Sequence, residues 1–166
     1  MAEQEHELPC MTEDQKHLVR ATFAQAERIS DIVGLILYKR LFELDPSLRP
    51  LFRHDIHEQS KKLMSTLKLA VGGLDQPKDM VSMIQALGRR HIQYGVTEGH
   101  YETVTSALLW TFEHALGSDF PLSARLAWKE VLEWLNKTMK EAANEARKSF
   151  DTSRFIHPAP EETSKS

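Results

Sequence analysis

The sequence has little of what marks secreted, membrane or nucleic-acid-binding proteins. Cys10 is the only cysteine among 166 residues, which excludes an internal disulfide. No run of about 18 apolar residues occurs, so no membrane-spanning helix is predicted, and the N-terminus lacks the basic start and apolar core of a signal peptide. With 21 Lys and Arg against 24 Asp and Glu, neither charge sign dominates, which argues against nucleic-acid and membrane partners. We therefore expect a cytoplasmic protein.

Glycine is scarce as well. The seven glycines never form a phosphate-binding loop, which removes the support for a nucleotide site. Apolar residues make up 41% of the chain, enough for a buried core, and the length favours one domain. Residues 1–11 and 150–166 are polar and lack apolar periodicity, so the sequence predicts a single domain over residues 12–149 between two flexible tails.

Helical spacing of apolar side chains runs through residues 12–149, with no convincing alternation of the kind that strands show. Thr12 and Gln15 form a capping box at the start of the first helix. In the second helix the apolar positions are Ile32, Leu35, Tyr38, Leu41 and Phe42. Further helices are predicted over about 56–74, through the segment around residues 80–91, after breaks at Gly95 and Gly99, and after Pro121. The fold class predicted from the pattern alone is all-α.

One histidine falls on an apolar stripe. Met80, Ile84, Leu87 and His91 are spaced by 4, 3 and 4 residues, so His91 occupies a position that calls for a core residue. Two interpretations stay open from spacing alone, a hydrogen-bonded core histidine and a cofactor ligand. His54 and His57 have metal-ligand spacing but lack further Cys or His partners, so a zinc site is not supported.

The order of these elements, with an aromatic residue after a proline-broken helix and a later histidine, resembles the globin family. The stretches Gln59-Ser-Lys-Lys-Leu-Met64 and Leu87-Gly-Arg-Arg-His-Ile-Gln-Tyr-Gly-Val96, followed by His100-Tyr101, look like single-domain bacterial haemoglobins related to flavohaemoglobins, the Hell's Gate globin type. Leu-Gly-Arg-Arg-His and Pro50-Leu-Phe52 are also similar to neuroglobin. The resemblance covers about residues 12–145 and implies a globin fold, with helices packed around a haem pocket.

This resemblance implies roles for individual residues. His91 would be the proximal ligand of the haem iron, and Phe52 would stack on the porphyrin. Tyr38 and Gln59 match the distal Tyr and Gln pair of the bacterial members, to which a catalytic role is assigned. Leu63 matches the apolar residue over the iron.

Three further cofactor contacts follow from the resemblance. Tyr101 matches a tyrosine on the proximal side, and Lys62 and Arg90 are placed to meet the haem propionates. A long cation on a helix is more often simply solvated, and that alternative stays open for both. Because the sequence has no Cys-x-x-Cys-His motif, the implied cofactor is noncovalent haem b.

The implied function is reversible O₂ binding, with CO and NO as further ligands. Conversion of NO to nitrate would require a separate reductase, because flavohaemoglobins continue into reductase domains and this sequence does not. Whether the protein is an enzyme, a possible nitric oxide dioxygenase, stays open. The alternative is a haem-based gas sensor or an oxygen-binding protein without turnover, and a haem-free regulator is disfavoured by Phe52 and His91. We expect a monomer or weak homodimer.

One departure from the catalytic members concerns the proximal side. They place on the last helix a tyrosine and a glutamate that form hydrogen bonds there, and the matching positions in this sequence are Leu132 and Ala143. Glu141 and Glu145 lie two residues out of phase, about 200° around a helix. The resemblance therefore does not extend to the electron push of peroxidase-like chemistry.

Overall fold

The structure, a computed structural model, describes residues 10–156 of the chain, with side chains up to residue 151. Every regular element in this part is helical, which confirms the all-α prediction. None of the helices described is both long and apolar enough to cross a membrane. The elements are α1 (Glu13–Arg28), α2 (Ser30–Leu44), the 3₁₀ helix η1 (Pro46–Leu51), α3 (Ile56–Gly72), α4 (Pro77–Gln93), α5 (Glu98–Leu116), the 3₁₀ helix η2 (Gly117–Asp119) and α6 (Leu122–Ile156).

Most helix ends lie where local chemistry predicts them. Thr12 and Gln15 form the expected capping box, in which the Gln15 N–H donates to Thr12 Oγ1 at 3.2 Å and the Thr12 N–H donates to Gln15 Oε1 at 2.8 Å. Gly95, at φ +81°, supplies the left-handed turn after α4. Gly99 lies in the first turn of α5, so the break predicted there is wrong. A glycine at negative φ costs helix stability without ending the helix.

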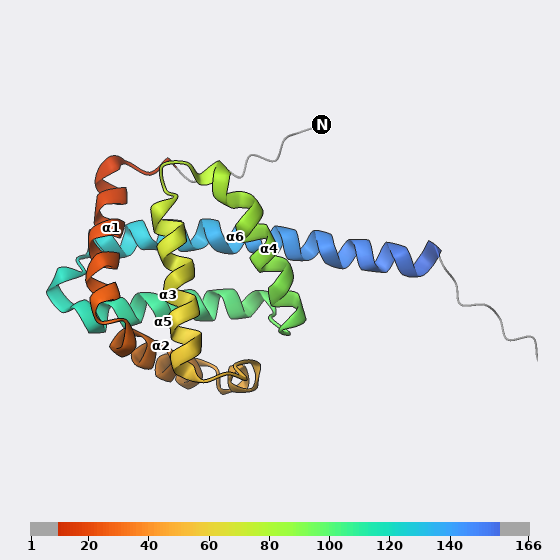
Figure 1. Cartoon of the computed structure of the whole chain (residues 1–166), viewed down its shortest axis with the longest axis horizontal. Helices are drawn as coiled ribbons and strands as arrows, with labels where there is room; N and C mark the ends of the chain where they lie inside the picture. Colours follow the sequence, from red (N-terminus) through yellow and green to blue (C-terminus); the bar gives the residue numbers. More distant parts are fainter. Residues whose placement is uncertain (1–9, 157–166) are drawn as a thin grey trace, which may run out of the picture.

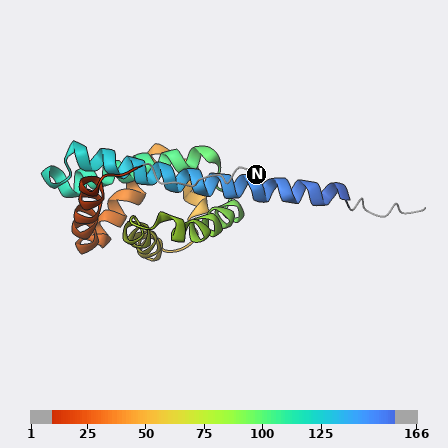
Figure 2. The ribbon, with the colours of Figure 1, turned by 90° about the horizontal axis from the view of Figure 1, so that it is seen from above.

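Two close backbone approaches fix how the helices cross. A Cβ on Gly34 of α2 would lie 2.6 Å from the Ser60 Cβ of α3, and a Cβ on Gly88 of α4 would lie 2.7 Å from the Met139 Cα of α6. α3 thus packs closely on α2, and α4 packs on α6. Figures 1 and 2 show α4 crossing in front of α6 and approaching it toward the C-terminal part of α4. Direct contact between α3 and α4 is slight.

The buried face of α2 differs from the prediction. Ile32 and Leu35 are 53% and 57% exposed, whereas Leu37, Tyr38 and Leu41 are buried. The first half of α2 is apolar almost all the way round, so periodicity alone could not select its inner face. The packing of α2 against α3 and α5 determines which face is buried, and Tyr38 lies on that face.

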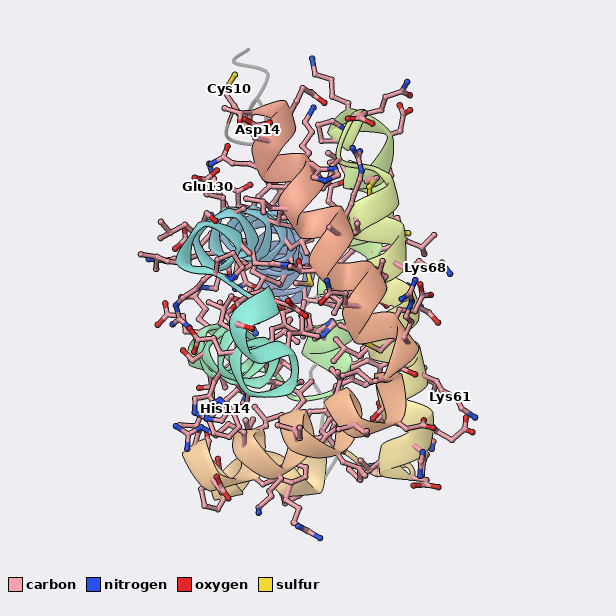
Figure 3. The ribbon with its side chains drawn as sticks, turned by 90° about the vertical axis from the view of Figure 1, so that its left-hand side faces the viewer. Cys10, Asp14, Lys61, Lys68, His114 and Glu130 are labelled. Carbon is pink, nitrogen blue, oxygen red and sulfur yellow. The ribbon has the colours of Figure 1, made fainter. Side chains whose placement is uncertain are left out.

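The body of the fold extends beyond the predicted domain at both ends. Met11 is 9% exposed and belongs to the core, so the body begins before residue 12. α6 continues to Ile156, past the predicted boundary at Ser149, and its last turns project beyond α4 (Figure 1). Cys10 is exposed beside the start of α1, at the same end of the molecule as Glu130 (Figure 3). The rest of the two predicted tails, residues 1–9 and 157–166, lies outside the described residues.

Candidate functional site

α4 holds His91 with one ring nitrogen fixed. Its Nδ1–H donates to the carbonyl oxygen of Leu87, one helical turn earlier, at 2.6 Å. Because a carbonyl only accepts, this bond selects the tautomer with a proton on Nδ1 and a lone pair on Nε2. Burial lowers the pKa of His91, the nearby Arg90 charge lowers it further, and the Leu87 bond opposes them. The ring is therefore neutral near pH 7 and has a free donor atom for a metal.

Two tyrosine rings flank His91. The Tyr101 ring of α5 lies 5.9 Å from the His91 ring and is 7% exposed, while the Tyr94 ring at the end of α4 lies 6.0 Å away and is 57% exposed. Lys140 of α6 places its ammonium 5.8 Å from the centre of the Tyr101 ring. Burial raises the pKa of Tyr101, and the positive charge of Arg147 opposes that shift. Tyr101 is therefore neutral near pH 7.

A second group of aromatic side chains surrounds Tyr38 of α2. The Tyr38 ring lies 5.3 Å from the Phe52 ring and 6.1 Å from the Phe42 ring, and these two phenylalanines are 5.7 Å apart. Tyr38 is 5% exposed, and burial raises the pKa of its hydroxyl to about 12. Within residues 10–151 the hydroxyl has no hydrogen-bond partner. The ring is thus buried, while the hydroxyl remains available to donate to a ligand.

Gln59 and Leu63 lie one turn apart on α3, and both are half-buried. Lys61 and Lys68 line a shallow hollow together with Glu27 of α1 and Asp31 of α2, so that side of α3 faces away from α4. Leu63 is two residues from Lys61, about 200° around the helix, and therefore faces the α4 side. The Gln59 amide forms no hydrogen bond with a described residue, including Tyr38.

The residues of α3 and α4 suit a flat apolar cofactor such as haem. α3 packs on α1 and α2, and α4 packs on α6, so the two helices that would enclose the group scarcely touch each other. Half-buried apolar side chains on or just before these two helices include Phe52, Ile56, Leu63 and Met83. A neutral imidazole on one side and unpaired hydroxyl and amide groups on the other match the needs of an iron porphyrin with a gaseous ligand.

Lys62 and Arg90 are exposed, on α3 and α4 respectively. Neither forms an ion pair with any residue whose side chain the structure describes. They lie on the two helices that would enclose the cofactor, which is compatible with the predicted contacts to propionates. The alternative of plain solvation stays open for both.

The proximal departure expected from the sequence has a clear structural counterpart. Leu132 and Ala143 are buried apolar residues of α6, 6% and 4% exposed. Glu141 lines a polar hollow of about 560 Å³ between α5 and α6, to which His91 does not contribute. No carboxylate of the described residues bonds to His91, whose polar partner is the neutral Leu87 carbonyl. Residues 10–151 also contain no group of three or more His, Cys, Asp or Glu that could hold a metal ion.

The sequence did not identify three residues that lie beside these groups in the structure. Phe42 completes the aromatic cluster, Tyr94 flanks His91, and Lys140 covers Tyr101. A signal existed for Phe42 and Tyr94, which lie four and three residues after Tyr38 and His91 and therefore share their helix faces. No local signal existed for Lys140, because 39 residues separate it from Tyr101 in sequence.

The comparisons with known proteins agree with this geometry. The sequence profile of the globin family matches residues 35–139. Neuroglobin of Danio rerio is 29% identical over 132 residues, covering 71% of this chain and 83% of the relative, and neuroglobin of Tetraodon nigroviridis is 30% identical over 127 residues, covering 68% and 80%.

Among solved structures, an engineered carbene transferase derived from a candidate nitric oxide dioxygenase of Rhodothermus marinus is similar in fold. Its TM-score is 0.76 with 26% sequence identity, over 85% of this chain and 99% of that one. Because the family profile covers well over half of the chain and the fold agrees, the protein belongs to the globin family.

Proposed function

We propose that this globin binds haem b between α3 and α4, with His91 as the iron ligand, and that it binds O₂ reversibly. The observation that carries the proposal is the pairing of two features. His91 has its tautomer fixed by Leu87, with a free Nε2, and a separate aromatic cluster holds the Tyr38 ring buried, with a hydroxyl that has no hydrogen-bond partner among the described residues. A hydroxyl without a partner in the protein can donate to a bound ligand.

Haem, when bound, would supply a ferrous iron that binds O₂ and can oxidise NO to nitrate. His91 would hold it as a neutral ligand. The Tyr38 hydroxyl would donate a hydrogen bond to the partial negative charge of a diatomic ligand, beside the Phe42 and Phe52 rings. Gln59 supplies a second donor from α3. Phe52 and Leu63 cover the faces of the porphyrin.

Conversion of NO to nitrate is the finer part of the proposal. The support is the likeness to the candidate nitric oxide dioxygenase of Rhodothermus marinus, together with the distal hydroxyl and amide. Each cycle consumes one O₂, one NO and one electron, so the cycle requires a reductase.

A second candidate function, O₂ binding or sensing without turnover, is favoured by the proximal side. The neutral Leu87 carbonyl polarises the imidazole less than a carboxylate would. An iron ligand without a carboxylate partner is suited to holding O₂ rather than to cleaving its O–O bond.

The test begins with the absorption spectrum of the purified protein, in which a Soret band is expected. NO is then added to the oxygenated protein, and nitrate is measured with and without a reductase extract. One nitrate per haem without the extract and many with it support dioxygenation. A stable oxygenated form that yields one nitrate even with the extract supports the second candidate, and absence of a Soret band after haem addition contradicts both.

A further inference from the structure

Cations of this protein are distributed unevenly around the site. The segments 46–62 and 85–97, which contain η1, the start of α3 and the end of α4, carry six Lys and Arg and only two Asp and Glu. Their net charge is +4 on a chain whose net charge is −3. The remainder of the molecule is therefore acidic, and the protein has a positive end.

The two segments lie at the same end of the fold. Gly95 follows α4, and a Cβ built on it would lie 3.5 Å from Leu51 Cδ2 of η1, the element that leads into α3. Figure 1 shows the end of α4 and the start of α3 on the same side of the molecule, with η1 between them. The His91 end of α4 and the Gln59 end of α3 thus share one rim.

Five exposed cations of the two segments, besides Lys61, lack ion-pair partners among residues 10–151: Arg49, Arg53, Lys62, Arg89 and Arg90. Arg49 lies over the Phe42 ring at 5.4 Å, and we call the other four the basic rim. Lys61 is excluded, because it and Lys68 point outward on the α1-facing side of α3, where Lys68 pairs with Glu27 at 2.6 Å (Figure 3).

Cations elsewhere are neutralised in part: seven form ion pairs, and five form none with a described residue, namely Arg28, Lys39, Lys78, Lys137 and Arg147. Lys16 and Arg20 both pair with Asp75, at 3.2 and 2.7 Å. Further pairs join Arg125 to Glu113, Lys129 to Glu133 and Lys140 to Glu102. A surface that leaves its cations unpaired is available to an anionic partner without first breaking existing ion pairs.

The basic rim also contains an aromatic anchor. Tyr94 is 57% exposed, follows Arg90 by one helical turn, and lies 6.0 Å from the His91 ring. Exposed Tyr and Arg side chains are the residue types that contribute most to protein interfaces. The two propionates of a bound haem would offset two of the positive charges, which leaves Arg53 and Arg89 to face the partner.

From these observations we infer that the basic rim is the docking surface for the acidic face of an electron-donating protein. The inference rests on the proposed haem site, since it names the kind of reductase that would serve it. One electron leaves the donor and reduces the ferric haem iron to the ferrous state. The long-range field of the positive end would steer an acidic donor toward the haem side, where transfer is shortest.

The test uses reduced flavodoxin, an acidic flavoprotein, as the donor for the ferric haem-loaded protein. Arg53→Glu/Arg89→Glu reverses two rim charges that have no assigned contact with haem. Lys78→Glu/Lys137→Glu is the matched control, because both lysines are exposed and unpaired among the described residues, and they lie at the far end of α4 and on α6. The control changes the net charge by the same amount.

We expect the rim variant to be reduced at least about tenfold more slowly than the wild type at low ionic strength. The difference should nearly vanish at about 1 M salt, where charges are screened beyond about 3 Å. The control variant should stay within about twofold of the wild type. Carbodiimide cross-linking of the wild type to oxidised flavodoxin should not join Lys78 or Lys137 to donor carboxylates.

Equal slowing of both variants, or cross-links at Lys78 or Lys137, would overturn the inference. A membrane partner would also overturn the inference. In that case the wild type, but not the rim variant, would bind vesicles of phosphatidylcholine and phosphatidylglycerol, and flavodoxin would reduce both proteins at the same rate. Free reduced riboflavin, which lacks the acidic protein face of flavodoxin, should reduce all variants at nearly the same rate. A normal oxygenated spectrum with charge-independent reduction refutes the docking surface alone, whereas failure to bind haem refutes the proposed function.

Discussion

The two sides of the candidate haem site are built differently. On the proximal side, His91 bonds to the Leu87 carbonyl at 2.6 Å, and α4 is seated on α6 through the Gly88 and Met139 backbones. On the distal side, Tyr38 is held by packing, and its hydroxyl and the Gln59 amide have no hydrogen-bond partners among the described residues. The hydrogen bond that orients His91 exists before a ligand binds, whereas the distal donors form their hydrogen bonds only with the ligand.

The difference indicates a division of labour. Affinity for the cofactor should depend on the proximal side, because a fixed imidazole loses little entropy on binding iron. Selection among gases should depend on the distal side, because an unpaired donor stabilises only a ligand that carries negative charge. Four substitutions test this division, in order of decreasing effect.

Replacing His91 by Ala should give a protein that purifies with little haem, because the change removes the only side chain placed to bind iron from α4. Haem content per chain and the Soret band provide the measurement. His54→Ala is the matched control, since His54 is exposed, and its haem content should equal that of the wild type. Full haem content and an unchanged spectrum in His91→Ala would contradict the assignment.

Gly88→Ala should destabilise the fold by about 1 to 3 kcal/mol, because its Cβ would overlap the Met139 backbone and force α4 away from α6. Urea unfolding measures the change, and haem loss should accelerate with it as His91 moves. Gly72→Ala has open space around its Cβ and should change stability by less than about 1 kcal/mol. Similar losses for both variants would show that helix propensity, and not the α4–α6 contact, sets the effect.

Tyr38→Phe should speed O₂ release by about 10- to 150-fold, the equivalent of a hydrogen bond of about 1.5 to 3 kcal/mol to a partly charged acceptor. CO release should change much less, since bound CO carries less negative charge. Because burial raises the pKa of Tyr38 to about 12, the hydroxyl stays protonated below that pH, and O₂ release should stay constant up to about pH 10. Laser photolysis or stopped-flow mixing gives both rates, and equal changes for O₂ and CO would point to packing instead.

Gln59→Leu should have the smallest effect, about 2- to 12-fold faster O₂ release, as expected for a hydrogen bond of about 0.5 to 1.5 kcal/mol from a neutral amide. Since Gln59 and Tyr38 do not bond to each other in the structure, the effects of the two substitutions should add in the double variant. A double variant no worse than Tyr38→Phe would instead show that Gln59 acts by orienting Tyr38.

Local patterns in the sequence were sufficient for much of the fold. The capping box at Thr12, the end of α2 before Asp45–Pro46, and the stripe that ends at His91 all depend on residues within one or two turns of each other. Helix termini and amphipathic faces follow from hydrogen-bonding and burial rules that act over that range. The globin resemblance then supplied roles for His91, Tyr38 and Gln59, which stay predictions until tested.

What the sequence left undecided involves residues far apart in the chain. Neither the exposure of Ile32 and Leu35 nor the contact of Lys140 with Tyr101 follows from spacing, because each depends on which helix packs on which. The same holds for the unpaired Tyr38 hydroxyl and for the basic rim, which joins residues about 35 positions apart. By itself the sequence determined the helices and the position of His91. Only the tertiary structure decided which polar groups were satisfied and which were left for a ligand or partner, because that depends on packing between helices.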